Sequence, residues 1–106
     1  MEYVYFISSD DKIKIGYTKN IKRRLKQLQT SNSSQLLLLG YIEGDKDVEK
    51  QLHKRFAQYR IRENGEWFNC SDEILDYINE YNLEPNIKVV QMDGKIYPCL
   101  SIQQQQ

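Results

Sequence analysis

The fold is decided by residues 3–16, which read YVYFISSDDKIKIG. The first five of these residues are aromatic or β-branched, which favours a strand. Four polar residues, 8–11, are typical of a turn, and the remainder alternates polar and apolar side chains with a period of two. The stretch therefore predicts an antiparallel hairpin. Its apolar side chains should point inward and its charged ones outward: Ile13 and Ile15 against Lys12 and Lys14.

A helix is expected directly after the hairpin. Ile21, Leu25 and Leu28 recur at i, i+4 and i+7, which predicts an amphipathic helix of about three turns. Thr18 or Asn20 can cap its first turn. The other faces of this helix are basic and carry Lys22, Arg23, Arg24 and Lys26.

The apolar run 36–42 has the length of a strand and is expected to be the most buried strand of the sheet. Asp45 can then cap a second helix, whose apolar positions are Val48, Leu52, Phe56 and Tyr59. On its polar side Glu49 and His53 are four residues apart and should be neighbours.

A third helix should begin after Ser71, because acidic residues follow this cap in the first turn, where the helix dipole favours them. Its expected core positions are Ile74, Leu75 and Ile78, with Tyr81 close by. After Pro85 the period changes to two, and Asp93-Gly94 between alternating segments predicts a second hairpin over 87–97.

Length limits the chain to one domain, since 106 residues is a typical domain size. The expected fold is α+β: a small mixed or antiparallel sheet, made of the first hairpin and a central strand, flanked by helices. The predicted divisions are a main domain (1–84), an added C-terminal β-hairpin (85–102) and a disordered glutamine tail (103–106).

The charge of the chain is distributed unevenly although its formal net charge is zero. Residues 12–62 hold thirteen of the fifteen Lys and Arg against four acids, a local excess of nine positive charges. Residues 63–84 hold seven acids and no base. The basic half favours a polyanionic partner, and a solvated helix face is the alternative.

Several classes of protein are excluded by composition. Two cysteines, Cys70 and Cys99, cannot supply the four ligands of a structural zinc site. A disulfide between them stays open, but two thiols in a reducing cytosol are the commoner arrangement. No apolar run approaches the length of a membrane span and no signal pattern opens the chain. We therefore expect an intracellular, cytoplasmic domain with no membrane partner.

Tyr3-Val4-Tyr5 and four further separated motifs follow one another along residues 3–80. Tyr3-Val4-Tyr5 precedes Lys-Ile-Gly-x-Thr (14–18), and Arg-Leu-x-x-Leu-x-Thr (24–30) comes next. The later motifs are Glu-x-x-Leu-His-x-x-Phe (49–56) and Gly-Glu-Trp-Phe (65–68). In this order the chain resembles the GIY-YIG nuclease superfamily, in the phage and viral branch related to the meiotically up-regulated gene 113 family.

This resemblance implies hydrolysis of DNA phosphodiesters with one divalent ion, Mg²⁺ or Mn²⁺. It implies that Tyr5 lies close to the attacking water as base or orienter, that Arg24 contacts the scissile phosphate, and that Glu49 binds the metal. These residue types suit the chemistry, because a cation and a metal stabilise the oxyanion of the transition state. Mg²⁺ prefers oxygen ligands and keeps several waters, so one carboxylate can suffice.

Further site residues follow from the same resemblance. Lys14 stands where the second half-motif has tyrosine, and Tyr3 where the first has glycine; a lysine there can lower the pKa of a neighbouring base. Tyr17 and His53 complete the catalytic candidates. Expected DNA-binding residues are Lys12, Lys19, Lys22, Arg23, Lys26, Lys54 and Arg55. Expected supporting residues are Glu66, Trp67 and Asn69, the last as the counterpart of an asparagine near the metal.

Structural explanations exist for the same residues. Tyr5 fits an ordinary core position, and Glu49 could pair with His53, Lys46 or Lys50 along its helix. His53 could be a hydrogen-bonded structural residue. Trp67 could anchor the second helix or stack on a base of a single strand.

The function that these observations favour is a metal-dependent DNA endonuclease, with a groove between the first hairpin and the two basic helices. Two alternatives stay open: a catalytically weak or inactive DNA-binding module of the same fold, and a protein-interaction domain that uses the acidic segment and the C-terminal hairpin. The oligomeric state is open between a monomer, a homodimer and fusion to another domain.

Overall fold

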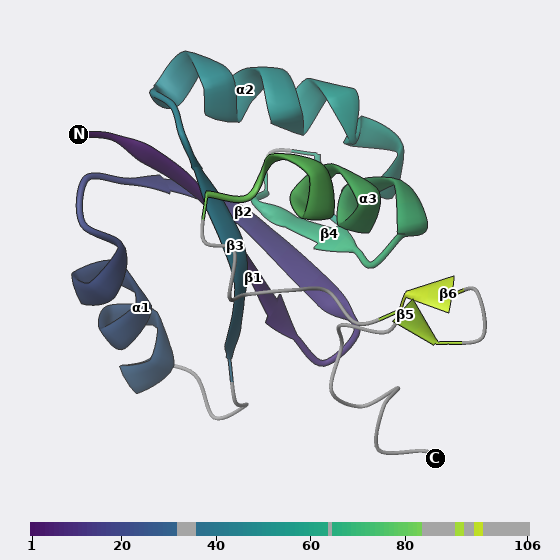
Figure 1. Ribbon diagram of the computed structural model, residues 1–106, viewed down its shortest axis with the longest axis horizontal. Helices are drawn as coiled ribbons and strands as arrows, with labels where there is room; N and C mark the ends of the chain where they lie inside the picture. Colours follow the sequence, from purple (N-terminus) through teal and green to yellow (C-terminus); the bar gives the residue numbers. More distant parts are fainter. Residues whose placement is uncertain (32–35, 64, 84–90, 93–94, 97–106) are drawn as a thin grey trace.

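The computed structural model describes residues 1–31, 36–63, 65–83, 91–92 and 95–96, and is shown in Figure 1. These residues form three helices, one 3₁₀ turn and six strands. In chain order they are β1 (Tyr3–Ser9), β2 (Lys12–Thr18), α1 (Ile21–Thr30), β3 (Leu37–Glu43), α2 (Lys46–Arg55), a 3₁₀ turn (Ala57–Tyr59), β4 (Trp67–Asn69), α3 (Asp72–Tyr81), β5 (Gln91–Met92) and β6 (Lys95–Ile96).

The main sheet has four antiparallel strands in the order β3-β1-β2-β4. This confirms the α+β class and the first hairpin, in which Ser9 pairs with Lys12 across a tight turn. Asp10 takes a positive φ of 55° there, a conformation that Asp tolerates better than most residues. The sequence did not predict β4, whose three residues extend the sheet beyond β2.

The prediction that 36–42 forms the most buried strand was wrong. β3 lies at an edge of the sheet, and Leu37, Leu38 and Tyr41 in it are only half-buried. The most buried strand is β1, in which five consecutive residues from Val4 to Ser8 are buried. β1 is hydrogen-bonded on both sides and covered on both faces, so an apolar run alone did not identify the central strand.

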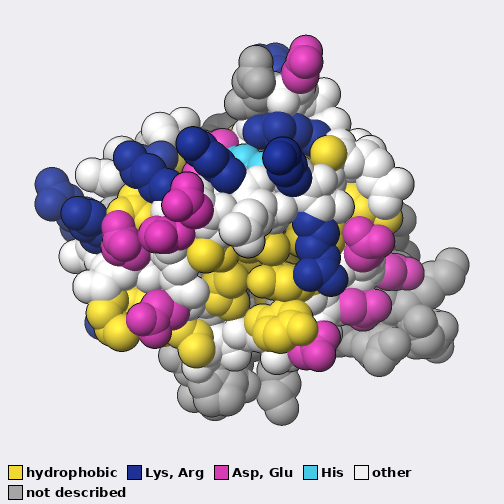
Figure 2. All heavy atoms as spheres, turned by 90° about the horizontal axis from the view of Figure 1, so that it is seen from above, with side chains coloured by type: hydrophobic (Ala, Val, Ile, Leu, Met, Phe, Trp, Pro, Cys, Tyr) yellow, Lys and Arg dark blue, Asp and Glu magenta, His cyan; other side chains and the backbone are white. Residues whose placement is uncertain are grey.

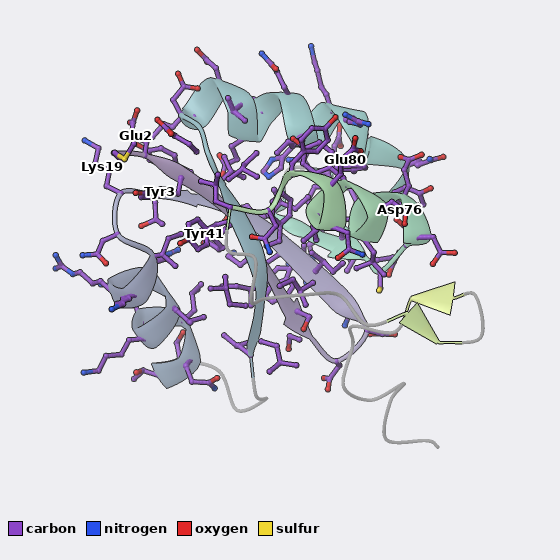
Figure 3. All side chains as sticks on the ribbon, viewed as in Figure 1. Glu2, Tyr3, Lys19, Tyr41, Asp76 and Glu80 are labelled. Atoms are coloured by element: carbon purple, nitrogen blue, oxygen red, sulfur yellow. The ribbon has the colours of Figure 1, made fainter. Side chains whose placement is uncertain are left out.

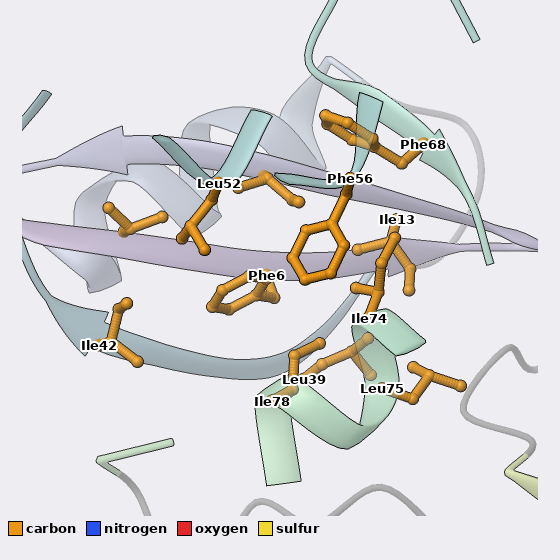
Figure 4. Packing of buried hydrophobic residues seen from close by; sticks show 12 residues of the cluster. Phe6, Ile13, Leu39, Ile42, Leu52, Phe56, Phe68, Ile74, Leu75 and Ile78 are labelled. Carbon is orange, nitrogen blue, oxygen red and sulfur yellow. The ribbon is translucent and has the colours of Figure 1, made fainter. Parts of the chain in front are cut away.

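The two faces of the sheet are covered by different helices (Figure 1). On one face α2 and α3 pack against Val4 and Phe6 of β1 and the isoleucines of β2. Figure 4 shows the Phe6 and Phe56 rings at the centre of this layer. On the other face α1 packs against Tyr5 and Ile7 of β1. Alternation along β1 therefore separates the main core from a smaller cluster that contains Tyr5.

Each helix begins at a residue that the sequence predicted as its cap. Asn20 accepts from the Arg23 amide, Asp45 from the amides that open α2, and Ser71 from the Ile74 amide. These side chains satisfy amides that have no partner within the helix. The caps fix where α1 and α2 start, and so they fix where Arg24 and Glu49 lie relative to the sheet.

β5 and β6 pair with each other, Gln91 with Ile96 and Met92 with Lys95. The sequence pattern over 87–97 predicted this pairing. The Asp93-Gly94 turn, the rest of the hairpin and the glutamine tail lie outside the described residues. Within the described part of the chain, no helix is long and apolar enough to cross a membrane.

Candidate functional site

Tyr5 and Arg24 meet on the face of the sheet that α1 covers. Tyr5 pairs with Gly16 across β1 and β2, and its phenol ring lies over the Gly16 backbone. The Arg24 Nε, from the first half of α1, donates to the Tyr5 hydroxyl over 3.4 Å. The structure thus brings together Tyr5 and one residue from each of the two motifs that follow it, 14–18 and 24–30.

The protonation of the Tyr5 phenol follows from its surroundings. Burial raises the pKa of Tyr5 above its usual value near 10, and the Arg24 guanidinium opposes this rise only in part. The hydrogen bond with Tyr5 in turn raises the pKa of Arg24. At neutral pH the pair is therefore a neutral phenol and a guanidinium cation.

Lys14 does not point into solvent as the hairpin pattern predicted. Its side chain is only 10% exposed, and its Nζ lies 3.0 Å from Glu66 Oε2. The same ammonium lies 5.4 Å from the centre of the Trp67 ring, a cation–π distance. The reason is β4: Lys14 pairs with Trp67, so the unpredicted strand covers a side chain that a two-stranded hairpin would expose.

Glu49, on α2, lies against the carboxyl group of Glu66. Burial is the largest cause that raises the pKa of Glu49, and the Glu66 charge and a hydrogen bond between the two carboxyls add to it. The Lys14 and Lys46 ammonium groups act in the opposite direction. The contact between Glu49 and Glu66 was not predicted, although both residues stand in motifs.

These contacts join residues from four elements and one loop into a single group, which we call the edge cluster: Tyr5, Lys14, Arg24, Glu49 and Glu66. The carboxyls of Glu49 and Glu66 are near enough to raise the pKa of Tyr5, and Glu66 also acts on Arg24. The edge cluster combines two cations, two carboxyls and one phenol, which suits a phosphate and a hard metal ion.

The edge cluster forms where the pairing of β2 with β4 stops. The last cross-strand pair is Lys14 with Trp67. Beyond it the Ile15 amide donates to the Glu66 carbonyl over 2.9 Å, and the Ile15 carbonyl accepts from His53 Nε2 over 2.8 Å. These two bonds hold Glu66 and α2 against an otherwise unpaired strand edge.

His53 has a different place from the one that its spacing to Glu49 suggested. The ring is buried, and its Nδ1 lies 3.2 Å from Arg60 Nη2. Because a guanidinium only donates, Nδ1 accepts and Nε2 carries the proton given to Ile15. Both ring nitrogens are used inside the fold, so the expected Glu49–His53 pair does not form and His53 holds α2 to β2.

Tyr17 lies apart from Tyr5. It follows Gly16 along β2 and so points to the opposite face of the sheet. Its hydroxyl donates to the Glu2 carboxylate, and Lys46 Nζ lies 5.6 Å from the ring centre. The hydrogen bond to Glu2 raises the pKa of Tyr17 to about 12. Tyr17 is thus bonded to Glu2 rather than to Tyr5, although it lines a shallow pocket together with Arg24.

The predicted DNA-binding side chains are all exposed, but they lie on two sides of the sheet: Lys12, Lys19, Lys22, Arg23, Lys26, Lys54 and Arg55. α1 and α2 cover opposite faces, so no single groove lies between them, which corrects that expectation. Figure 2 looks onto α2 and shows most Lys and Arg side chains of this face in the upper half of the view.

A shallow pocket connects the basic residues of α1 with the edge cluster. It is lined by Tyr17, Thr18, Lys19, Asn20, Arg23, Arg24 and Gln27. The acids of α3 lie elsewhere: Figure 3 shows Asp76 and Glu80 on this helix and Lys19 at the opposite side of the molecule. The separation of charge along the sequence is therefore a separation in space for α3 but not for Glu66, which contacts Lys14.

Two supporting candidates have clear positions. Asn69 is exposed at the end of β4 and pairs with Lys12 of β2. Glu66 is a member of the edge cluster. Among the described residues, no three His, Cys, Asp or Glu side chains converge on a metal position, so Glu49 and Glu66 are the carboxyls that the site offers.

Residues 2–82 match the T5orf172 domain, a family linked to phage endonuclease-type domains, and the match includes every member of the edge cluster. No curated protein and no solved structure matches the chain. Since the match covers more than half of the sequence, the chain belongs to the T5orf172 domain family.

Proposed function

We propose that this domain is a DNA endonuclease of the GIY-YIG type that depends on one divalent ion. The observation that carries the proposal is the edge cluster, in which Tyr5 lies on Gly16, bonds Arg24 and stands near Glu49. Membership of the T5orf172 family supports a nuclease-like, DNA-binding domain. The four motifs are separated in sequence, and a nuclease site explains why they converge.

A divalent ion fits the carboxyl end of the edge cluster. Burial, the Glu66 charge and a hydrogen bond between the two carboxyls raise the pKa of Glu49, and a bound cation would oppose this rise by favouring the ionised carboxylate. Both offer the oxygen ligands that Mg²⁺ and Mn²⁺ accept, and Mg²⁺ completes its shell with waters and phosphate oxygens. Glu49 would hold the ion, and Lys14 holds Glu66 next to it.

Each side chain then has a defined task. The bound ion would supply charge stabilisation at the phosphate. Arg24 presents a guanidinium, which can contact two phosphate oxygens at once. Tyr5 stays a neutral phenol because burial raises its pKa, so it orients the attacking water through hydrogen bonds rather than removing its proton as a phenolate.

A DNA-binding module without cleavage is the second candidate, and one observation favours it. The Lys14 ammonium already lies 3.0 Å from Glu66 and compensates part of the negative charge that would attract a metal. If this compensation is sufficient, the domain binds DNA through its basic residues and does not cut. The two candidates share the basic surface and differ only at Glu49.

Nicking of supercoiled plasmid tests the proposal. Wild-type protein is assayed with Mg²⁺, with Mn²⁺ and with EDTA, beside Glu49→Gln and the control Glu80→Gln, which alters an exposed acid on α3. Metal-dependent nicking by wild type and the control, lost in Glu49→Gln, is the expected result. Binding without nicking in any metal replaces the proposal with the DNA-binding module, and neither binding nor nicking removes both.

A further inference from the structure

A second pocket lies next to the edge cluster. Trp67 separates it from the end of β2 that contains Gly16. It has a volume of about 460 Å³ and is lined by Ser9, Asp10, Lys12, Ile61, Arg62, Gly65 and Trp67. Neither the expected catalytic groups nor the family match gives it a task. Its walls come from the turn of the first hairpin, the segment before β4, and β4 itself.

We propose that this pocket binds one unpaired nucleotide of the DNA strand that is cut, beside the scissile phosphate. The proposal rests on the proposed function and adds to it the class of substrate: single-stranded DNA, or DNA with an unpaired nucleotide next to the cut. Stacking would hold the base, and the cations at the rim would hold its phosphate.

The chemistry of the lining matches a nucleotide. The half-buried Trp67 and the exposed Ile61 provide an apolar wall for the face of a base. Lys12 and Arg62, both exposed, provide positive charge for a phosphate. Asp10 and Ser9 offer acceptors for the amino groups on the edge of a base. Aromatic side chains beside basic ones are the usual means of holding single strands.

The position of the pocket links it to the edge cluster. Lys12, Lys14 and Gly16 lie on the same face of β2, because every second residue of a strand shares a face. Trp67 of β4 pairs with Lys14 and lies on that face too. α1 covers β1 and β3 on this side, so Tyr5 and Arg24 stand at the border of the part formed by β2 and β4. From Gly16 to Lys12 the strand rises about 13 Å, a length that a few nucleotides span.

The pocket requires an unpaired base for a geometric reason. In a duplex the faces of the bases are covered by their neighbours, so only phosphates would reach Lys12 and Arg62. A base that stacks on Trp67 must leave its own stack, which costs least in a single strand or beside a branch. A duplex would therefore use the cations of the pocket and leave its apolar wall unused.

Tryptophan fluorescence reports the pocket directly, because Trp67 is the single tryptophan of the chain. The full chain is titrated in EDTA, so that no cutting occurs, with a 12-nucleotide oligothymidylate and separately with a 12-base-pair duplex. The expected result is quenching by the single strand and affinity about 10-fold greater than for the duplex at equal salt. Equal affinity, or single-strand binding that leaves the Trp67 emission unchanged, overturns the proposal.

Two variants separate the pocket from general charge. Arg62→Gln should weaken oligothymidylate binding several-fold, whereas Lys50→Gln, an exposed lysine on α2, should change it much less. Equal effects would show a diffuse basic surface and overturn the proposal. Because Trp67→Phe could disturb the fold, the base is removed from the DNA instead. A 12-residue abasic oligomer, which keeps the sugars and phosphates, should not quench the Trp67 emission. Quenching that persists overturns the stacking.

The readout distinguishes this proposal from the proposed function. Quenching by a single strand in a protein that never nicks DNA leaves the nucleotide pocket standing and removes the nuclease. Cleavage of duplex plasmid with no quenching by the oligothymidylate does the reverse.

Discussion

The Tyr5 ring occupies the space that a side chain at Gly16 would need. A Cβ added at residue 16 would lie 2.3 Å from the Tyr5 hydroxyl oxygen, far inside van der Waals contact. Glycine is therefore required here by a close approach, because nothing larger than hydrogen fits under the phenol. This contact sets the height of the Tyr5 hydroxyl above the sheet, where Arg24 bonds it.

We predict that Gly16→Ala displaces the Tyr5 ring and separates its hydroxyl from Arg24. Overpacking of this kind costs about 1–3 kcal/mol of unfolding free energy. Cleavage should fall at least 10-fold, since small errors of position at a reacting centre have large effects on rate. Thermal melts and plasmid nicking measure the two effects.

Gly65→Ala is the matched control for that substitution. A Cβ at residue 65 would lie 3.4 Å from the Arg62 Cβ, an ordinary contact, so stability should stay close to wild type. Gly65 lines the proposed nucleotide pocket, so this control applies to stability alone. A Gly16→Ala protein as stable as Gly65→Ala and as active as wild type would show that the ring position over Gly16 has no consequence.

Tyr5→Phe is expected to separate catalysis from folding. The ring keeps its buried place, and the lost hydroxyl removes one hydrogen bond from Arg24, about 0.5–1.5 kcal/mol. If the phenol orients the attacking water, cleavage should fall about 100-fold or more while DNA affinity is retained. Cleavage at the wild-type rate would reduce Tyr5 to a core residue.

The local parts of this fold were predictable, and the reasons are local. The caps Asn20, Asp45 and Ser71 act on amides within three residues, so sequence spacing alone places them. The hairpin of β1 and β2 likewise depends on its own turn. Tyr5, Arg24 and Glu49 were identified by their motifs, and the structure adds their geometry.

The parts that were missed depend on contacts between distant segments. The partner of Lys14, Glu66, is 52 residues away along the chain, and β4 is too short for its pattern to predict a strand. Without β4, the alternation of lysine and isoleucine in β2 predicts that the Lys14 side chain is exposed to solvent. His53 was placed on a polar helix face for the same reason, since its acceptor, the Ile15 carbonyl, belongs to another element.

A double-mutant cycle on Lys14 and Glu66 should show strong coupling. Lys14→Met leaves two carboxyls without their nearest cation, and Glu66→Gln leaves a buried ammonium without its counter-ion. The Lys14 side chain is buried and Glu66 is partly exposed, so removing one partner of this pair should cost more than removing both, by less than in a fully buried pair. We expect a coupling free energy of about 1–3 kcal/mol from chemical denaturation. Additive effects of the two substitutions would make the pair an incidental surface contact.

The basic surface of α1 should control the salt dependence of DNA binding. Lys22 and Lys26 are exposed on this helix. Replacing both by Gln should weaken binding and reduce the slope of log affinity against log salt by about one per lost phosphate contact. Fluorescence anisotropy at several salt concentrations measures the slope. A slope equal to that of wild type would place the DNA on another face.

Glu49 provides a further prediction because its carboxyl has a raised pKa in the folded state. In the unfolded chain the group titrates near its ordinary value, about 4.5. Protonated Glu49 therefore contributes stability that is fully present below that value and is lost as pH rises through the folded-state pKa. As pH rises through that pKa, Glu49 loses its proton and its carboxylate is left beside the Glu66 carboxyl.

Glu49→Gln should consequently melt at a higher temperature than wild type at pH 7, while the two proteins should converge near about pH 4, where both are uncharged at this position. The Gln amide also donates to the Glu66 carboxyl in place of the lost proton.

Cleavage by Glu49→Gln should fall at least 100-fold, as expected when about 3 kcal/mol of transition-state stabilisation is removed. Mg²⁺ should raise the melting temperature of wild type but not of the variant, because an ion that binds only the folded state stabilises it. An equal response of both proteins to Mg²⁺ would remove Glu49 as the metal ligand, whatever the nicking assay shows, and a lower melting temperature at pH 7 would contradict the carboxyl contact itself.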